Sequence, residues 1–326
     1  MKLPAKRPAA SVGLLAVVVF AAAVDLRPVS GEGGAEPPER AVSRALSRAV
    51  DAGARHLVAI RPADDDARRR ARSGVVVGPD LVATCASNVD VFGVDDLVVE
   101  DAAGRVLPAS LRGRDLRLRV VVLRVPDLGA PAPAPVTERR AGAFVLALGG
   151  VLGGPAAPTA TQGVVSVTGR FEGRADQVDA PLDASTWGGP LVDLAGGLIG
   201  VTVHVDARLG ERSGVGFAVP VPRIQAVLER LAQGDQLEAG WIGVVIPRHD
   251  DGEPGVPVRG VVPNSAAAAA GLQTGDRIVG VAGRAIPGRR AFREVAADLY
   301  AGQAIELEVL RAGTARRLEL TVAPRR

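Results

Sequence analysis

Short apolar runs separated by turn residues fill the chain from His56 to Val219. Gly74–Val77 and Leu81–Thr84 flank the turn Gly78-Pro79-Asp80, a pattern that predicts a β-hairpin. Further strands are expected at 56–60, 97–100, 106–111, 120–125, 144–148, 163–167, 191–192, 198–205 and 216–219. Many short strands with Gly and Pro between them predict a β-sandwich or a pair of β-barrels.

Helical periodicity occurs on both sides of this β-rich region. Before it, the apolar positions are Val42, Leu46, Ala49 and Val50, and Gly53 stands at the expected C-cap. After it, residues 222–231 place Ile224, Val227, Leu228 and Leu231 on one side of a helix. The polar segment 233–239 reads as a linker, and a second, smaller unit follows over 240–326.

The N-terminus has the pattern of an export leader. Lys2, Lys6 and Arg7 precede the apolar stretch 11–24, and Ala21-Ala22-Ala23 resembles a cleavage site. We therefore expect residues 1–24 to be a signal peptide, or alternatively an uncleaved membrane anchor, and residues 25–38 to be a flexible spacer. Either reading predicts an exported protein, periplasmic or otherwise outside the cytoplasmic membrane.

Composition narrows the classes of partner and cofactor. The formal charge of +3 comes from the leader, because removing its three basic residues from the 39 leaves 36, equal to the 36 acidic residues. No basic patch for nucleic acid is evident. The single cysteine, Cys85, excludes an intramolecular disulfide, and the three histidines show no metal-ligand spacing. Asp64-Asp65-Asp66 is interpreted as a solvated loop, so neither a metal nor a cofactor is expected.

Several motifs in a fixed order give the β-rich region a family resemblance. They are T-C-A-S-N-V from Thr84, G-R-D-L-R-L-R-V from Gly113, W-G-G-P from Trp187 and G-V-G-F-A-V-P from Gly214. In this order they resemble the HtrA/Deg family of exported trypsin-like serine proteases over about residues 41–232. The resemblance implies a mostly β fold in which residues 39–232 form two six-stranded barrels of the chymotrypsin type.

The three catalytic positions implied by this resemblance do not carry catalytic residues. Such enzymes need a serine nucleophile, a histidine base and an aspartate that orients the histidine. Ser87 occupies the histidine position, Arg119 the aspartate position and Trp187 the serine position. Loss of the nucleophile or base alone lowers turnover about 10⁶-fold in well-studied serine proteases. The sequence therefore predicts no catalytic residues and an inactive enzyme homologue.

A rearranged active site is the alternative that the residues leave open. Ser185 and Thr186 are hydroxyl side chains close to the lost nucleophile, but they would still need a base. His204 is the one histidine expected near them, since His56 opens the first strand and His249 belongs to the second unit.

Residues 240–326 resemble a PDZ domain of the HtrA arrangement, an α+β fold. Gly240-Trp241-Ile242-Gly243-Val244 matches the family's carboxylate-binding loop, and V-V-P-N-S-A-A-A-A-A-G-L from Val261 matches a second motif. PDZ domains bind an extended peptide by strand addition and hold its terminal carboxylate with loop N–H groups. Phe292, Val295 and Leu299 recur at helical spacing and either line the groove or belong to the core. The expected peptide-binding residues are Trp241, Ile242, Gly243, Val244, Ile246, Phe292, Val295 and Leu299.

Three functions follow from these readings. The first is a pseudoprotease that binds unfolded or C-terminal segments of envelope proteins as a scaffold, holdase or regulator in protein quality control. The second is a serine endopeptidase with a non-standard nucleophile. The third is a non-catalytic subunit that co-assembles with active relatives, and a homotrimer or a hetero-oligomer would suit this family.

Overall fold

The computed structural model describes residues 37–63, 71–93, 96–136, 138–150, 157–205 and 214–325. The chain divides after Ala41, and the larger unit runs from Val42 to Arg326. The expected leader, the spacer up to residue 36 and the Asp64-Asp65-Asp66 loop lie outside the described residues. Among the helices of the described part, none is both long enough and apolar enough to cross a membrane.

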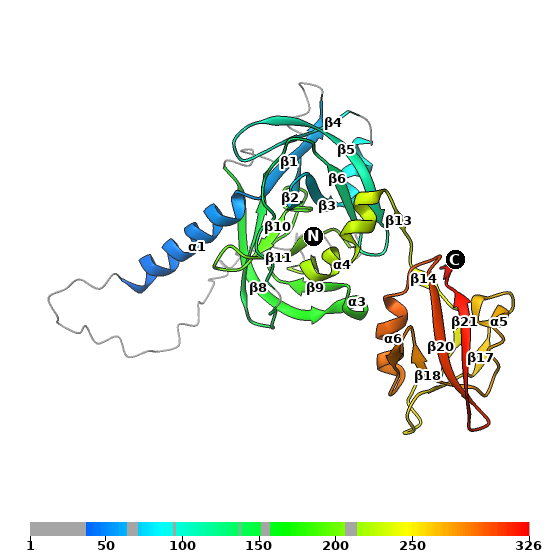
Figure 1. The fold of residues 1–326 in the computed structure, drawn as a ribbon. Helices are drawn as coiled ribbons and strands as arrows, with labels where there is room; N and C mark the ends of the chain where they lie inside the picture. Colours follow the sequence, from blue (N-terminus) through cyan, green and yellow to red (C-terminus); the bar gives the residue numbers. More distant parts are fainter. Residues whose placement is uncertain are drawn as a thin grey trace, which may run out of the picture. The chain divides into compact units, whose positions relative to one another are not determined.

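The first barrel is a closed antiparallel sheet made from the N-terminal half of the β-rich region (Figure 1). Its neighbours run β5-β4-β1-β2-β3-β6, and β5 pairs with β6 to close the ring. The strands are β1 (Leu57–Pro62), β2 (Arg72–Gly78), β3 (Leu81–Cys85), β4 (Leu97–Glu100), β5 (Val106–Asp115) and β6 (Val120–Arg124). The predicted hairpin is confirmed as β2 and β3, with Val75 opposite Ala83.

The second barrel closes in the order β10-β11-β12-β9-β8-β7. Its strands are β7 (Phe144–Gly149), β8 (Thr159–Gly169), β9 (Ala175–Val178), β10 (Pro190–Val192), β11 (Leu198–Val203) and β12 (Gly216–Pro220). The predicted mostly β fold of two six-stranded barrels is confirmed. Sequence patterning missed β9, because its A-D-Q-V sequence buries the charged side chain of Asp176, which pairs with Arg139.

Four helical segments accompany the barrels. They are α1 (Pro38–Ala54), α2 (Ala86–Phe92), the tight turn α3 (Arg170–Gly173) and α4 (Val221–Gln233). The face predicted for α4 is confirmed, since Ile224, Val227 and Leu231 are all buried. Gly234 ends α4 in a left-handed conformation, where its N–H caps the last turn.

Gly53 has a different role from the C-cap that the sequence suggested. Helix α1 continues through Ala54, so Gly53 lies inside it. A Cβ atom at Gly53 would stand 2.6 Å from Cδ1 of Leu148 and 3.2 Å from Cγ1 of Val192. The glycine therefore lets the helix backbone come close to the second barrel.

The segment 233–239, expected to be a linker, includes a short strand. Strand β13 (Gln236–Leu237) pairs in parallel with the end of β5, and Leu116 N–H donates to the Leu237 carbonyl at 2.9 Å. Leu237 is 2% exposed and joins the core cluster that also contains Leu231 and Ile224. The hydrophobic pattern did not predict this strand, because Leu237 is its one strongly apolar residue.

The C-terminal part is an α+β region with its own core, as the resemblance implied. Its strands are β14 (Gly240–Trp241), β15 (Val244–Val245), β16 (Val256–Pro257), β17 (Gly260–Val261), β18 (Arg277–Val281), β19 (Arg284–Ala285), β20 (Ala304–Arg311), β21 (Thr314–Thr321) and β22 (Ala323–Pro324). Its helices are α5 (Ala266–Ala269) and α6 (Arg289–Ala297). Buried Ile278, Leu307 and Phe292 belong to this core.

Because Leu237 is part of a core, truncating it should destabilise the fold. We predict that Leu237→Ala lowers the free energy of unfolding by roughly 2–4 kcal/mol, the range for Leu-to-Ala changes in cores. The matched control is Leu116→Ala in the same backbone pairing, because Leu116 is 47% exposed. Urea unfolding followed by circular dichroism measures both variants, and equal losses would contradict the buried role of β13.

Candidate functional site

The three positions that the sequence singled out lie around His204, the residue that follows β11. The guanidinium of Arg119 donates to the carbonyl of His204 at 3.3 Å, and the rings of His204 and Trp187 lie 4.4 Å apart. The His204 N–H donates to the Cys85 sulfur at 3.4 Å, and that sulfur lies 3.1 Å from the Ser87 hydroxyl. A catalytic triad would be assembled at this place in a trypsin-like fold.

Trp187, which the family resemblance assigns to the nucleophile position, has an aromatic ring and no hydroxyl. Its indole packs on the His204 imidazole at an interplanar angle of 45°. His204 follows β11 directly, so the histidine that sequence spacing placed near the nucleophile is indeed its neighbour. The imidazole has an aromatic partner there, and stacking gives it no oxygen from which to take a proton.

Ser87 and Arg119 supply neither a base nor a carboxylate. Ser87 lies in the first turn of α2, half-buried, with the Cys85 thiol as its hydrogen-bonding neighbour. Arg119 adopts a left-handed backbone conformation, with φ of 57°, and its side chain is exposed. The other two histidines of the chain lie in other elements: His56 precedes β1, and His249 is exposed in the C-terminal part.

The backbone N–H groups that would form an oxyanion hole are already hydrogen-bonded. In trypsin-like enzymes this hole uses the N–H of the nucleophile and of the residue two positions earlier, here Trp187 and Ser185. The N–H of Trp187 donates to the carbonyl of Asp183 at 2.9 Å, and that of Ser185 donates to the Asp183 carboxylate at 2.8 Å. The Ser185 hydroxyl donates to the same carboxylate at 2.6 Å. Asp183 thus occupies the donors on which oxyanion stabilisation depends.

Asn88 fixes the Trp187 turn and was missed by sequence reasoning. It is 1% exposed, and its amide nitrogen lies 2.7 Å from the Trp187 carbonyl and 3.0 Å from the Thr84 hydroxyl. The Thr84 hydroxyl in turn donates to the carbonyl of Ser73 at 2.6 Å. The spacing of Thr84 and Asn88, four residues apart at the start of a short helix, is the sequence pattern that could have revealed this contact.

Asp115, the aspartate of the G-R-D-L-R-L-R-V motif, is the buried last residue of β5. Its carboxylate accepts the N–H groups of Arg117 and Leu118 at 2.9 and 2.8 Å, and the Tyr300 hydroxyl at 2.6 Å. Burial, followed by the negative charge of Asp115, raises the pKa of Tyr300 above its ordinary value. Asp115 therefore shapes the turn that leads to Arg119, and its hydrogen-bond donors here are Arg117, Leu118 and Tyr300.

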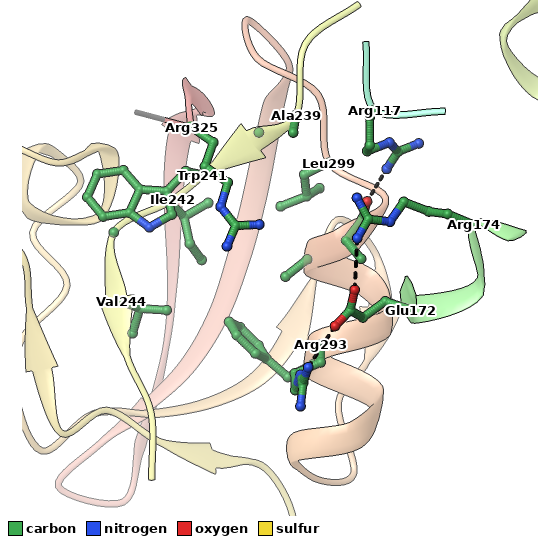
Figure 2. A pocket seen from close by; sticks show the side chains of 15 residues that line it. Arg117, Glu172, Arg174, Ala239, Trp241, Ile242, Val244, Arg293, Leu299 and Arg325 are labelled. Atoms are coloured by element: carbon green, nitrogen blue, oxygen red, sulfur yellow. Dashed lines mark hydrogen bonds and ion pairs between the residues drawn. The ribbon is translucent and has the colours of Figure 1, made fainter. Parts of the chain in front are cut away.

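A second candidate site lies in the C-terminal part, between the 241–244 loop and α6 (Figure 2). Six of the eight expected peptide-binding residues line this pocket: Trp241, Ile242, Gly243, Val244, Phe292 and Leu299. Val295 is 3% exposed and belongs to the core, and Ile246 packs against that core. The pocket also includes Arg293, Ala296 and Arg325, which sequence patterning did not single out.

The loop conformation depends on Gly243. Its φ is 85°, and a Cβ atom there would lie 2.1 Å from Cβ of Ser265. The carbonyls of Ile242 and Gly243 accept the N–H groups of Ala267 and Val262 at 2.8 and 2.9 Å. Within the described ranges, neither the Ile242 N–H nor the Gly243 N–H has an acceptor. The loop is held by its carbonyls while two donors remain available.

Comparisons with known families agree with this architecture. Residues 72–201 match the trypsin-like peptidase domain family, and residues 240–322 match the PDZ domain family. The fold and the position of the cleft define a trypsin-like peptidase domain followed by one PDZ domain.

Individual relatives make the assignment more specific. The chain is 31% identical over 276 residues to a probable periplasmic serine endoprotease DegP-like of Pseudomonas fluorescens, covering 79% of this chain and 57% of that protein. It is 29% identical to periplasmic serine endoprotease DegP of Escherichia coli K12, covering 74% and 54%. The chain therefore spans little more than half the length of these curated relatives.

Solved structures with the same arrangement are also similar. An HtrA-type protease AlgW with a decapeptide matches with a TM-score of 0.66 and 25% identity, covering 86% of this chain and 99% of that one. A serine endoprotease from Yersinia pestis matches with a TM-score of 0.64 and 27% identity, covering 86% and 98%. The chain belongs to the HtrA/DegP type of trypsin-like serine proteases with one PDZ domain.

Removing the Asn88 amide should loosen the Trp187 turn. We predict that Asn88→Ala destabilises the protein by about 1–3 kcal/mol, since buried carbonyls lose their donor. The control is Ser87→Ala, one residue away in α2, whose half-buried hydroxyl has the Cys85 sulfur as its hydrogen-bonding neighbour. Urea denaturation compares the two, and a loss for Asn88→Ala no larger than the control's would contradict this role.

Proposed function

We propose that this protein is an exported HtrA-type pseudoprotease that binds unfolded or C-terminal segments of envelope proteins without cleaving them. The observation that carries the proposal is Trp187 at the nucleophile position, held by Asn88 and stacked on His204. Hydrolysis by a trypsin-like site requires a hydroxyl oxygen to attack and a base to take its proton. The cleft supplies neither in the required position.

The engaged oxyanion donors add a second, independent barrier. Serine proteases without their triad keep a residual rate of about 10³–10⁴ over water, which comes from the oxyanion hole and from binding. Here Asp183 accepts both N–H groups that would form that hole. The residual rate should therefore be lost as well.

Peptide binding is supported by the geometry of the PDZ domain. Strand β15 pairs with β17 and with no other strand of the described chain, so one of its edges is open for strand addition. The two unpaired loop donors, Ile242 and Gly243, lie at the end of that edge. AlgW, a structural relative, is known in complexes with a decapeptide and a tripeptide.

The location and the partners follow from the same reading. The curated relatives are named as periplasmic, and the leader-like residues 1–24 are consistent with export. We propose a periplasmic or other extracytoplasmic location and a role as scaffold, holdase or regulator.

The alternative is a non-catalytic subunit that co-assembles with active relatives. Co-purification from the native envelope distinguishes the two roles, because an active relative present in stoichiometric amount would favour co-assembly.

The non-standard protease is the remaining alternative, with Ser185 as its most plausible nucleophile. The Ser185 hydroxyl donates to the Asp183 carboxylate at 2.6 Å, which resembles a nucleophile–base pair. The same carboxylate oxygen also accepts the Ser185 N–H. If Asp183 acted as the base for the Ser185 hydroxyl, it would still hold this N–H, which the oxyanion hole requires as a donor. This conflict favours the pseudoprotease.

A fluorophosphonate probe tests the proposed inactivity. We expect no labelling of the wild-type chain and no degradation of unfolded casein above background. The triple reversion Ser87→His, Arg119→Asp and Trp187→Ser should also stay unlabelled, because it leaves the contacts of Asp183 with Ser185 and residue 187 in place. Labelling of wild type that disappears in Ser185→Ala would establish the alternative protease and overturn the proposal.

The loop geometry gives a test of peptide binding. Gly243→Ala should weaken binding of free C-terminal peptides about tenfold or more, equivalent to roughly 1.4 kcal/mol, because it displaces the loop donors. Gly260→Ala is the control, since its Cβ would lie 3.7 Å from Cβ of Val245, an ordinary contact. Fluorescence anisotropy with the full chain measures both, and equal affinities would remove the loop from the binding site.

A further inference from the structure

A small pocket in the protease-like domain lies beside Arg119 and is separate from the PDZ groove. It has a volume of about 200 Å³, and residues of the β5–β6 turn, the α3 turn and the end of β11 contribute to it. Three arginines and six apolar residues line it, and no carboxylate is among these lining residues. Pockets for whole small molecules measure roughly 300–1,000 Å³, so this one is of a size for one or two side chains.

Two of the three arginines share their acidic partners with other cations. Arg174 contacts the carboxylate of Glu172 at 3.0 Å, and Arg293 contacts the same carboxylate at 2.6 Å, as Figure 2 shows. Arg117 lies 3.8 Å from the carboxylate of Asp298, which also pairs with two further arginines. Two carboxylates thus serve five guanidinium groups, and the region around the pocket keeps a positive charge.

Arg119 is the third arginine, and it has no carboxylate partner among the described residues. Its guanidinium donates to the carbonyl of His204 at 3.3 Å, and its side chain is exposed. A carbonyl oxygen orients the guanidinium without neutralising its charge. Arg119 is therefore placed to meet an anion that arrives from solvent.

The apolar wall of the pocket is formed by side chains other than Trp187. His204 packs on the indole of Trp187, whereas its two neighbours in the chain, Val203 and Val205, line the pocket. Phe171 lines the pocket as well and is 39% exposed. The tryptophan at the nucleophile position therefore leaves this pocket available to a ligand.

A pocket with these walls favours a carboxylate next to an apolar group. Cations gathered in one concave site raise the local concentration of anions, and guanidinium groups fit carboxylates especially well. Aspartate and glutamate side chains are the carboxylates that occur within a polypeptide, and their neighbours in an unfolded chain are often apolar. A single acidic side chain also suits the volume of the pocket.

We propose that this pocket binds an acidic side chain of a client polypeptide, with Arg119 as its ion-pair partner. Phe171, Val203 and Val205 contact an apolar side chain next to it in the client. The inference rests on the proposed function and narrows one class of its partners to internal segments that combine acidic and large apolar residues. The carboxylate in question belongs to a side chain, so this site needs no chain end.

The test measures binding of internal segments to the full chain. Two fluorescein-labelled decapeptides rich in leucine and valine are blocked at both ends, and they differ only in carrying glutamates or glutamines at the same positions. Anisotropy gives their affinities for wild type and for Arg119→Gln. Wild type should prefer the glutamate peptide by about fivefold or more. Arg119→Gln should lose most of this preference and bind the glutamine peptide within about twofold of wild type, because only the ion pair is removed.

The matched control is Arg124→Gln, an exposed arginine at the far end of β6 that should change neither affinity. Added salt should reduce the preference of wild type for the glutamate peptide, because it screens exposed charges. A third peptide, with a free C-terminus, reports on the PDZ groove.

Three results would overturn the inference and leave the proposed function standing. Wild type could bind both blocked peptides equally, it could bind neither while binding the free C-terminal peptide, or Arg119→Gln could retain the full preference for glutamate. Failure of wild type to bind any of the three peptides would overturn the proposed function as well.

Discussion

The structure of the protease-like domain depends on the tight packing of the Gly188-Gly189 turn against both barrels, which leaves no space for a side chain at either glycine. A Cβ at Gly188 would lie 2.1 Å from the Thr84 hydroxyl, and one at Gly189 would lie 2.0 Å from the carbonyl of Leu148. The turn therefore accepts no side chain, and Asn88 of α2 donates to the preceding carbonyl, that of Trp187, at 2.7 Å. The residue at position 187 is presented to the cleft by backbone contacts that do not depend on its side chain. This explains how the scaffold can persist with a tryptophan at that position.

The scaffold and the chemistry of such a fold are separable in physical terms. Barrel closure and buried apolar strands determine stability, whereas hydrolysis depends on a few proton-transfer groups and on two unoccupied N–H donors. A chain that retains the former can lose the latter at little cost in folding. The N–H groups of Ser185 and Trp187 donate to Asp183 and stabilise the 183–187 turn.

Much of the fold could be predicted from the sequence because its strongest patterns are local. The β2–β3 hairpin needs only two apolar runs and a Gly-Pro-Asp turn, and the buried face of α4 follows its periodicity. Strand β13 could not be found in this way, because Leu237 is buried by residues distant in the chain. The predicted C-cap at Gly53 was wrong for a related reason. Glycine is favoured both where a helix ends and where a helix backbone comes close to another element, here Leu148.

For the candidate sites, motif positions identified the residues at the cleft, but not the interactions between them. The stacking of Trp187 on His204, and the capture of the loop N–H groups by Asp183, depend on backbone geometry that no spacing encodes. In the PDZ domain, periodicity placed Val295 with Phe292, although only Phe292 faces the pocket. Main-chain pairing along β15 cannot distinguish one peptide from another, so selectivity must come from pocket walls and from charge.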